Sequence, residues 1–66
     1  MRVKINKNPI RLYLRKHCYT YEEFMSLAGI PKNRQRNVIL HEDRVDLKDV
    51  IKMSRFMEVN LYVLIG

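Results

Sequence analysis

The sequence predicts a single all-α domain, a compact bundle of five short helices with a short N-terminal arm. Apolar residues recur at helical spacing in several segments, and residues that cap helix N-termini precede most of these segments. The 66 residues include only 2 Gly and 2 Pro, and 47% of them are apolar. This composition is typical of a folded globular chain, and the length allows one small core without a deep catalytic pocket.

The N-terminal arm comprises residues 1–8, in which apolar residues alternate with cations, and it is either disordered or a short strand. The pair Asn8 and Pro9 predicts the start of the first helix, over residues 9–17. Asn accepts hydrogen bonds from N–H groups that lack a partner at a helix start, and Pro has no N–H to satisfy there. Residues 9–66 form the one predicted domain.

The second and third helices have clear boundaries in the sequence. Thr20 with Glu23 three residues later matches a capping box, so the second helix is predicted to begin at Tyr21. Gly29 ends this helix because it tolerates the left-handed conformation. After a turn of a few residues, the third helix is predicted over residues 32–40.

The fourth and fifth helices are predicted in the same way. Asp46 and Asp49 repeat the spacing of a cap followed by an acid, and the fourth helix follows over residues 47–57. Asn60 caps a last short helix, residues 61–65. The side chains predicted to form the core are Ile10, Tyr13, Leu14, Phe24, Leu27, Ile30, Val38, Ile39, Leu47, Val50, Ile51, Met57, Val59, Leu61, Leu64 and Ile65.

Positive charge is concentrated in one part of the chain. The sequence has 13 Lys and Arg against 7 Asp and Glu, a formal net charge of +6. Nine of these cations and only two of the acids lie before Val38, whereas four cations and five acids follow. This distribution favours a surface that binds a polyanion over one that serves only solubility.

Several classes of protein are excluded by what the sequence lacks. A lone cysteine, Cys18, cannot form an intramolecular disulfide, which favours a reducing, cytoplasmic location. No apolar run is long enough to span a bilayer. His17, Cys18 and His41 lack the spacing of a zinc site, and no nucleophile motif, phosphate-binding glycine loop or paired carboxylates appear. We therefore expect no enzyme activity, metal, cofactor or small-molecule substrate.

Three short stretches at fixed spacing resemble the Cro and phage-repressor (Xre-type) helix-turn-helix family. Residues 20–24 read Thr-Tyr-Glu-Glu-Phe where the family has Thr-x-Glu-Glu-Leu, and residues 27–30 read Leu-Ala-Gly-Ile where it has Leu-Leu-Gly-Val. Residues 59–61 read Val-Asn-Leu where it has Val-Ser-Leu. The register runs without a gap from Ile10 to Ile65. The resemblance implies a five-helix bundle of the lambda-repressor-like helix-turn-helix type.

The resemblance also implies that the third helix lies in the DNA major groove, with base contacts from Lys32, Asn33, Arg34 and Asn37. Arg36 is added because residues three and four apart share a helix face, and it contacts either a base or a phosphate. The local chemistry independently fits this role, since residues 32–37 carry six hydrogen-bonding side chains, three of them cationic and none acidic. Arg and Lys match guanine O6 and N7, and Asn matches adenine N6 and N7.

The phosphate contacts have open alternatives. Thr20 and the N–H groups of the following turn form an anion site, or Thr20 serves only as a cap. Tyr21 stands where the family favours Gln, and it either donates its hydroxyl to a phosphate or packs its ring. Arg11, Arg15 and Arg44 are expected to reach flanking phosphates.

Three further positions depart from the family pattern. Met25 and Gln35 replace a small Ala and a buried Ile or Val, and we expect Gln35 to tilt its amide outward while the flexible Met25 fills the space. Glu58 stands where the family ends a helix with Gly, which implies either a different helix terminus or a strained one.

The expected function is sequence-specific binding of a double-stranded DNA operator by a small transcriptional regulator that acts as a repressor. The family usually binds palindromic sites as a homodimer with two-fold symmetry. The alternative is a protein-interaction module or antitoxin-like subunit with the same helical fold. RNA binding is a weaker third option, because no aromatic residue lies in the basic helix where bases could stack.

Overall fold

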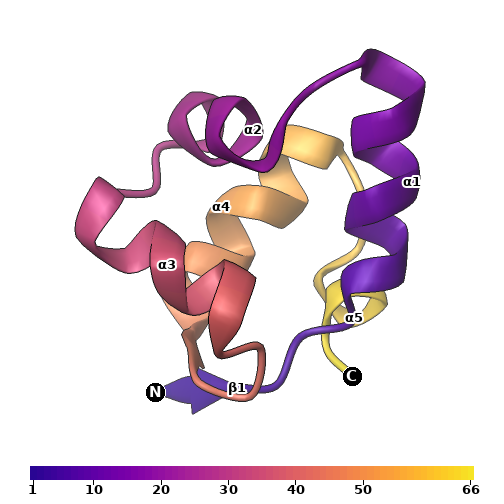
Figure 1. Ribbon diagram of the computed structural model, residues 1–66. Coiled ribbons are helices and arrows are strands. Elements are labelled where there is room, and N and C mark those ends of the chain that lie inside the picture. Colours follow the sequence, from indigo (N-terminus) through magenta and orange to yellow (C-terminus); the bar gives the residue numbers. More distant parts are fainter.

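Five helices and one small antiparallel sheet make up the fold (Figure 1). The computed structural model describes all residues, Met1–Gly66. The elements are β1 (Arg2–Val3), α1 (Lys7–His17), α2 (Tyr21–Ala28), α3 (Lys32–Leu40), β2 (Val45–Asp46), α4 (Leu47–Met57) and α5 (Leu61–Leu64). The predicted five helices are thus confirmed, and the sheet adds a feature that an all-α description omits. None of the helices combines the length and the apolar character needed to cross a membrane.

The predicted caps of α2 are present. The Thr20 side chain accepts a hydrogen bond from the Glu23 N–H at 3.2 Å, and the Glu23 carboxylate accepts one from the Thr20 N–H at 3.1 Å. Gly29 ends the helix with φ +91°. These bonds satisfy backbone groups that have no partner inside the helix.

The caps of α4 and α5 are confirmed as well. Asp46 accepts from the N–H of Lys48 at 3.1 Å. Asn60 accepts from the N–H of Tyr62 at 2.9 Å, and α5 ends at Leu64, one residue earlier than predicted. The side chain of the cap residue therefore fixes the start of each of these helices.

The start of α1 was predicted two residues too late. The cap is Asn6, whose side chain accepts from the N–H of Asn8 at 3.1 Å, and the helix begins at Lys7. Pro9 lies inside the first turn. It is tolerated there because the first four N–H groups of a helix have no intrahelical acceptor.

The N-terminal arm is a strand that packs into the domain. β1 pairs antiparallel with β2, with Val3 opposite Val45. Ile5 bridges to Ile65 and is only 2% exposed. Backbone hydrogen bonds from Asn6 N to Leu64 O at 2.7 Å and from residue 66 N to residue 4 O at 3.0 Å hold the two chain ends together. The arm thus contributes directly to the core.

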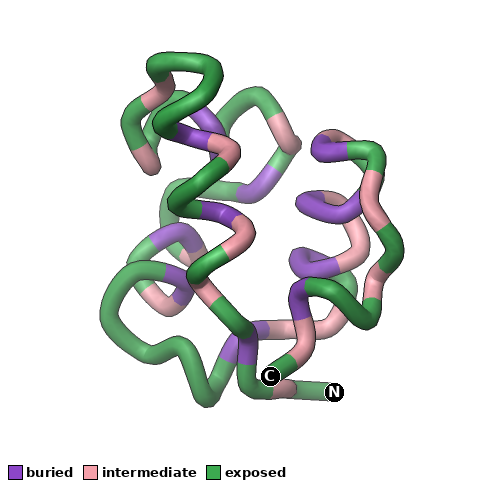
Figure 2. The backbone as a smooth tube through the Cα atoms, turned by 90° about the vertical axis from the view of Figure 1, so that its right-hand side faces the viewer, coloured by how far each residue is buried: buried purple, intermediate pink, exposed green.

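The core lies in the space that the helices enclose, and Figure 2 shows the buried positions facing this common interior. Its members are Ile5, Ile10, Leu14, Phe24, Met25, Ile30, Val38, Val45, Val50, Met53, Met57 and Leu64. Two predicted members are wrong, since Leu27 and Ile39 are 58% and 39% exposed, and two more, Leu47 and Ile51, are half-buried outside this cluster. Leu27 lies off the inward-facing stripe of α2, which residues 21, 24, 25 and 28 form.

Candidate nucleic-acid interface

The outer face of α3 carries unpaired polar side chains. Lys32, Asn33 and Arg36 are exposed, and Asn37 is half-buried. No side-chain hydrogen bond or ion pair links any of these four residues to the rest of the protein. Their donor groups are therefore available to a ligand, as the sequence predicts for a base-reading helix.

Arg34, a predicted base contact, is paired with a carboxylate inside the protein. Its Nε donates to Oδ2 of Asp49 at 2.9 Å, and its terminal nitrogen donates to Oδ1 at 3.2 Å. The Asp49 side chain is only 2% exposed, and such a buried carboxylate requires a partner. The hydrogen bond to Asp49 raises the pKa of Arg34 above its usual value. Arg34 therefore anchors α3 to the first turn of α4, and two of its nitrogens are already bound within the protein.

Asp49 itself was predicted to repeat the acid of a capping box. Its two carboxylate oxygens bind Arg34, so it does not turn back to the cap residue. The sequence has the spacing of a cap and an acid, but the carboxylate of this acid forms an ion pair with Arg34 of another helix. A planar guanidinium that binds both oxygens forms a stronger and more directional contact than one N–H group.

Gln35 points inward, so the expected outward tilt of its amide is wrong. The residue is 7% exposed, and its Nε2 donates to the backbone oxygen of Ile30 at 2.8 Å and to Oγ of Ser26 at 3.3 Å. Met25 is fully buried in the core. Gln35 thus satisfies a carbonyl of the turn between α2 and α3 and fixes the angle between these helices.

Two lysines of neighbouring helices donate hydrogen bonds to backbone oxygens at the ends of α2 and α3. The sequence analysis predicted neither contact. Lys52 of α4 donates to the backbone oxygen of Gly29, at the end of α2, at 3.2 Å. Lys7 of α1 donates to the backbone oxygen of Ile39, near the end of α3. No local signal could have revealed these contacts, since each acceptor is a backbone carbonyl 23 or 32 residues away.

The start of α2 offers fewer phosphate contacts than predicted. Thr20 is exposed at the helix start, where its hydroxyl oxygen accepts from Glu23. The Tyr21 ring packs against the core, and its hydroxyl is buried without a hydrogen-bond partner. Of the two predicted roles for Tyr21, the structure therefore shows packing, and a buried hydroxyl is not available to a phosphate.

The remaining predicted phosphate ligands are exposed cations. Arg11 and Arg15 lie four residues apart on α1 and so share one face of that helix. Arg44 lies in the turn between α3 and β2. The side chains of these three residues have no hydrogen-bond or ion-pair partner in the protein, so each is free to bind an anion.

The soft ligands are scattered. His17 stacks on Tyr13, with ring centroids 4.3 Å apart, and Cys18 follows as the exposed, left-handed cap of α1. No three His, Cys, Asp or Glu side chains are grouped so that they could hold a metal ion.

Comparison of the chain with protein-family models, curated proteins and solved structures finds no match. The function is therefore inferred from the residues and their placement.

Proposed function

We propose that the protein binds double-stranded DNA sequence-specifically as a small cytoplasmic transcriptional regulator of the lambda-repressor-like helix-turn-helix type. In this proposal α2 and α3 are the two helices of the motif, and α3 enters the major groove. The observation that carries the proposal is the outer face of α3, where Lys32, Asn33, Arg36 and Asn37 present unpaired donors without an acid among them.

The chemistry of these four side chains matches base edges. Lys and Arg donate to O6 and N7 of guanine, and Asn both donates to and accepts from adenine. Base reading requires that the helix be held rigidly, because small displacements break such contacts. Arg34, Gln35, Lys7 and Lys52 supply this support from α3 and from its neighbours.

Contacts to the DNA backbone would supply most of the affinity. Thr20 and the N–H groups of the first turn lie at the start of α2, which packs against α3, and Arg44 lies in the turn that follows α3. Arg11 and Arg15 lie on α1 and would contact phosphates farther from the bases. We further propose a homodimer on a palindromic operator, with the exposed Tyr62 and Val63 of α5 as partner contacts.

The first experiment is selection of binding sites from a random duplex pool at moderate salt. A recovered motif with inverted symmetry supports both specificity and a dimer. The variant Lys32→Ala/Asn33→Ala/Arg36→Ala is expected to bind the selected duplex at least 100-fold more weakly, because each good base contact contributes about 1–3 kcal/mol. Its folding should be intact, since these side chains have no partner in the protein.

The matched control is Lys16→Ala/Arg55→Ala, which removes two exposed cations outside the proposed interface. Its affinity for the selected duplex should stay close to that of the unaltered protein. Unchanged affinity of the α3 variant, or a pool from which no motif emerges, overturns the proposal. A protein-interaction module or antitoxin-like subunit would then be the better assignment.

A further inference from the structure

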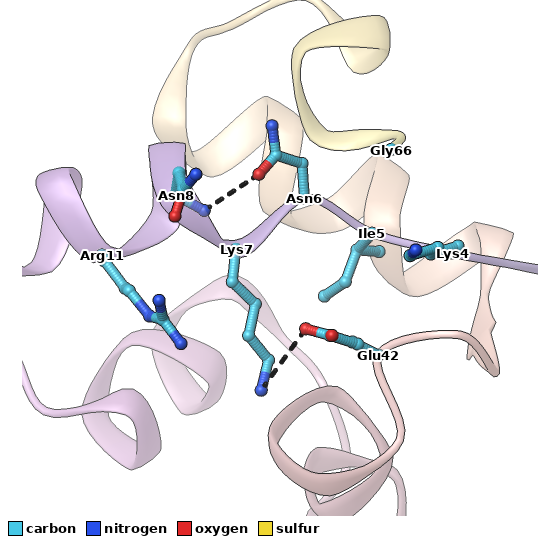
Figure 3. Close-up of a pocket in the computed structure, with 8 residues that line it drawn as sticks. All are labelled: Lys4, Ile5, Asn6, Lys7, Asn8, Arg11, Glu42 and Gly66. Atoms are coloured by element: carbon cyan, nitrogen blue, oxygen red, sulfur yellow. Dashed lines mark hydrogen bonds and ion pairs between the residues drawn. The ribbon is translucent and has the colours of Figure 1, made fainter.

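A polar hollow of about 380 Å³ lies where the N-terminal arm, the start of α1 and the turn after α3 meet (Figure 3). Three cations line it, namely Lys4, Lys7 and Arg11, against a single side-chain carboxylate, that of Glu42. Asn8 adds an amide that can donate or accept. This is the one cavity of the molecule with such an excess of cations in its walls.

The three cations are not equivalent. Lys7 donates to the backbone oxygen of Ile39, lies 3.9 Å from Oε2 of Glu42, and has a side chain that is only 15% exposed. The carboxylate of Glu42 thus has its own counter-ion. Lys4 and Arg11 are exposed and have no hydrogen-bond or ion-pair partner in the protein. In Figure 3, Lys4 and Arg11 lie at opposite ends of the hollow, with Lys7 and Glu42 between them, and together they give its walls an excess of positive charge that favours an anion.

The hollow adjoins the proposed reading helix. The bond from Lys7 to Ile39 places it next to the C-terminal end of α3. In Figure 3, Arg11 extends from α1 to the same side as Lys7, and Lys7 points to Glu42 in the turn that follows α3. An anion held here would therefore lie beside the end of the helix whose outer face carries Arg36 and Asn37.

We propose that this hollow binds a phosphate group of the DNA backbone that flanks the bases contacted by α3. The inference rests on the proposed function and adds Lys4 and Asn8 to the interface. A guanidinium donates two N–H groups to one phosphate, an ammonium adds a charge-assisted hydrogen bond, and the Asn amide can add a neutral one. Such contacts fix the register of a helix in the groove without selecting a sequence.

The test measures how salt weakens binding to the selected duplex for the variant Lys4→Gln/Arg11→Gln. Each lost phosphate contact should reduce the slope of log affinity against log salt by about 1. The hollow holds one phosphate in this proposal, so raising salt from 50 to 200 mM should weaken the double variant roughly fourfold less than the unaltered protein. The preferred sequence should not change. The control Lys16→Gln/Arg55→Gln removes the same charge elsewhere and should keep the original slope.

Three outcomes separate the possibilities. A reduced slope in the hollow variant alone supports the inference. An unchanged slope, with sequence-specific binding retained, overturns the hollow and leaves the proposed function standing. If the unaltered protein selects no duplex, the proposed function itself fails. A fourth measurement is titration with inorganic phosphate, followed by NMR signals of Lys4, Asn8 and Arg11. If phosphate saturates these signals while Lys4→Gln/Arg11→Gln binds the duplex like the unaltered protein, the hollow is a site for a free anion. That result overturns its assignment to DNA.

Discussion

Tyr21 illustrates how a single side chain can lie at a proposed DNA interface without contacting DNA. Its ring packs on the core, and its hydroxyl is buried without a partner. A buried hydroxyl that lacks a hydrogen bond destabilises the folded state, because it has lost its bonds to water. A tyrosine at this position suggests a hydroxyl that donates to a phosphate. The apolar surroundings of this hydroxyl would instead suit a phenylalanine.

Replacing Tyr21 by Phe should raise the free energy of unfolding by about 1 kcal/mol, since the substitution removes only the unsatisfied group. Urea denaturation measures this change. Affinity for the selected duplex should be the same as that of the unaltered protein. A weaker affinity of Tyr21→Phe would instead restore the hydroxyl as a phosphate contact.

Glu58 is strained at the end of α4. It has φ +58°, a left-handed conformation that side chains other than Gly adopt at a cost. Glu58→Gly should therefore raise the free energy of unfolding by about 1 kcal/mol. Glu58→Ala is the matched control, because it removes the carboxylate but keeps the strain. Equal stability of the two variants in chemical denaturation would argue against strain at this position.

At the scale of elements, the start of α4 makes stability depend on pH. The bond from the N–H of Lys48 lowers the pKa of Asp46 below its ordinary value of 3.8. Because the folded-state pKa is the lower one, this stabilisation is fully present above pH 3.8 and is lost as the pH falls through the folded value.

Asp46→Asn keeps a good helix cap but removes the titrating group. The difference in unfolding free energy between the unaltered protein and Asp46→Asn should therefore be constant above about pH 5 and shrink below pH 3.8. Thermal unfolding across this range measures the difference. A gap that stays constant down to pH 2 would show that the Asp46 carboxylate does not stabilise the fold.

The same elements show what a sequence can predict. The starts of α2, α4 and α5 were predicted correctly because cap and helix are neighbours in the chain. The pairing of Arg34 with Asp49 joins two helices, and a basic stretch alone cannot tell which of its cations is already bound. Four of the five predicted base-reading side chains have no partner in the protein, three of them exposed and Asn37 half-buried, and the fifth, Arg34, pairs with Asp49.

At the scale of the whole molecule, the N-terminal arm forms a short strand, which is one of the two alternatives that the sequence left open. Ile5 lies between the start of α1 and the end of the chain, and its side chain is buried in the core. The alternation of apolar residues and cations permitted a strand here. Its partner strand, β2, lies some forty residues later, so nothing in the neighbouring sequence indicated the pairing.

Ile5→Ala should lower the free energy of unfolding by about 2–4 kcal/mol, because it leaves a cavity in the core. A domain of this size has only a few kcal/mol in total, so a substantial fraction of the variant should be unfolded at 37 °C. Circular dichroism during heating measures this loss. The exposed Leu12→Ala is the control, and a similar effect of both substitutions would mean that the arm is not part of the core.

The pairing of residues 4–6 with residues 64–66 has a kinetic consequence. Closing a loop that contains almost the entire chain is entropically costly, so these bonds should form only after the helices have assembled on one another. They would then be absent from the folding transition state. Weakening them should accelerate unfolding and leave the refolding rate nearly unchanged, which makes this closure the step that sets the lifetime of the native state.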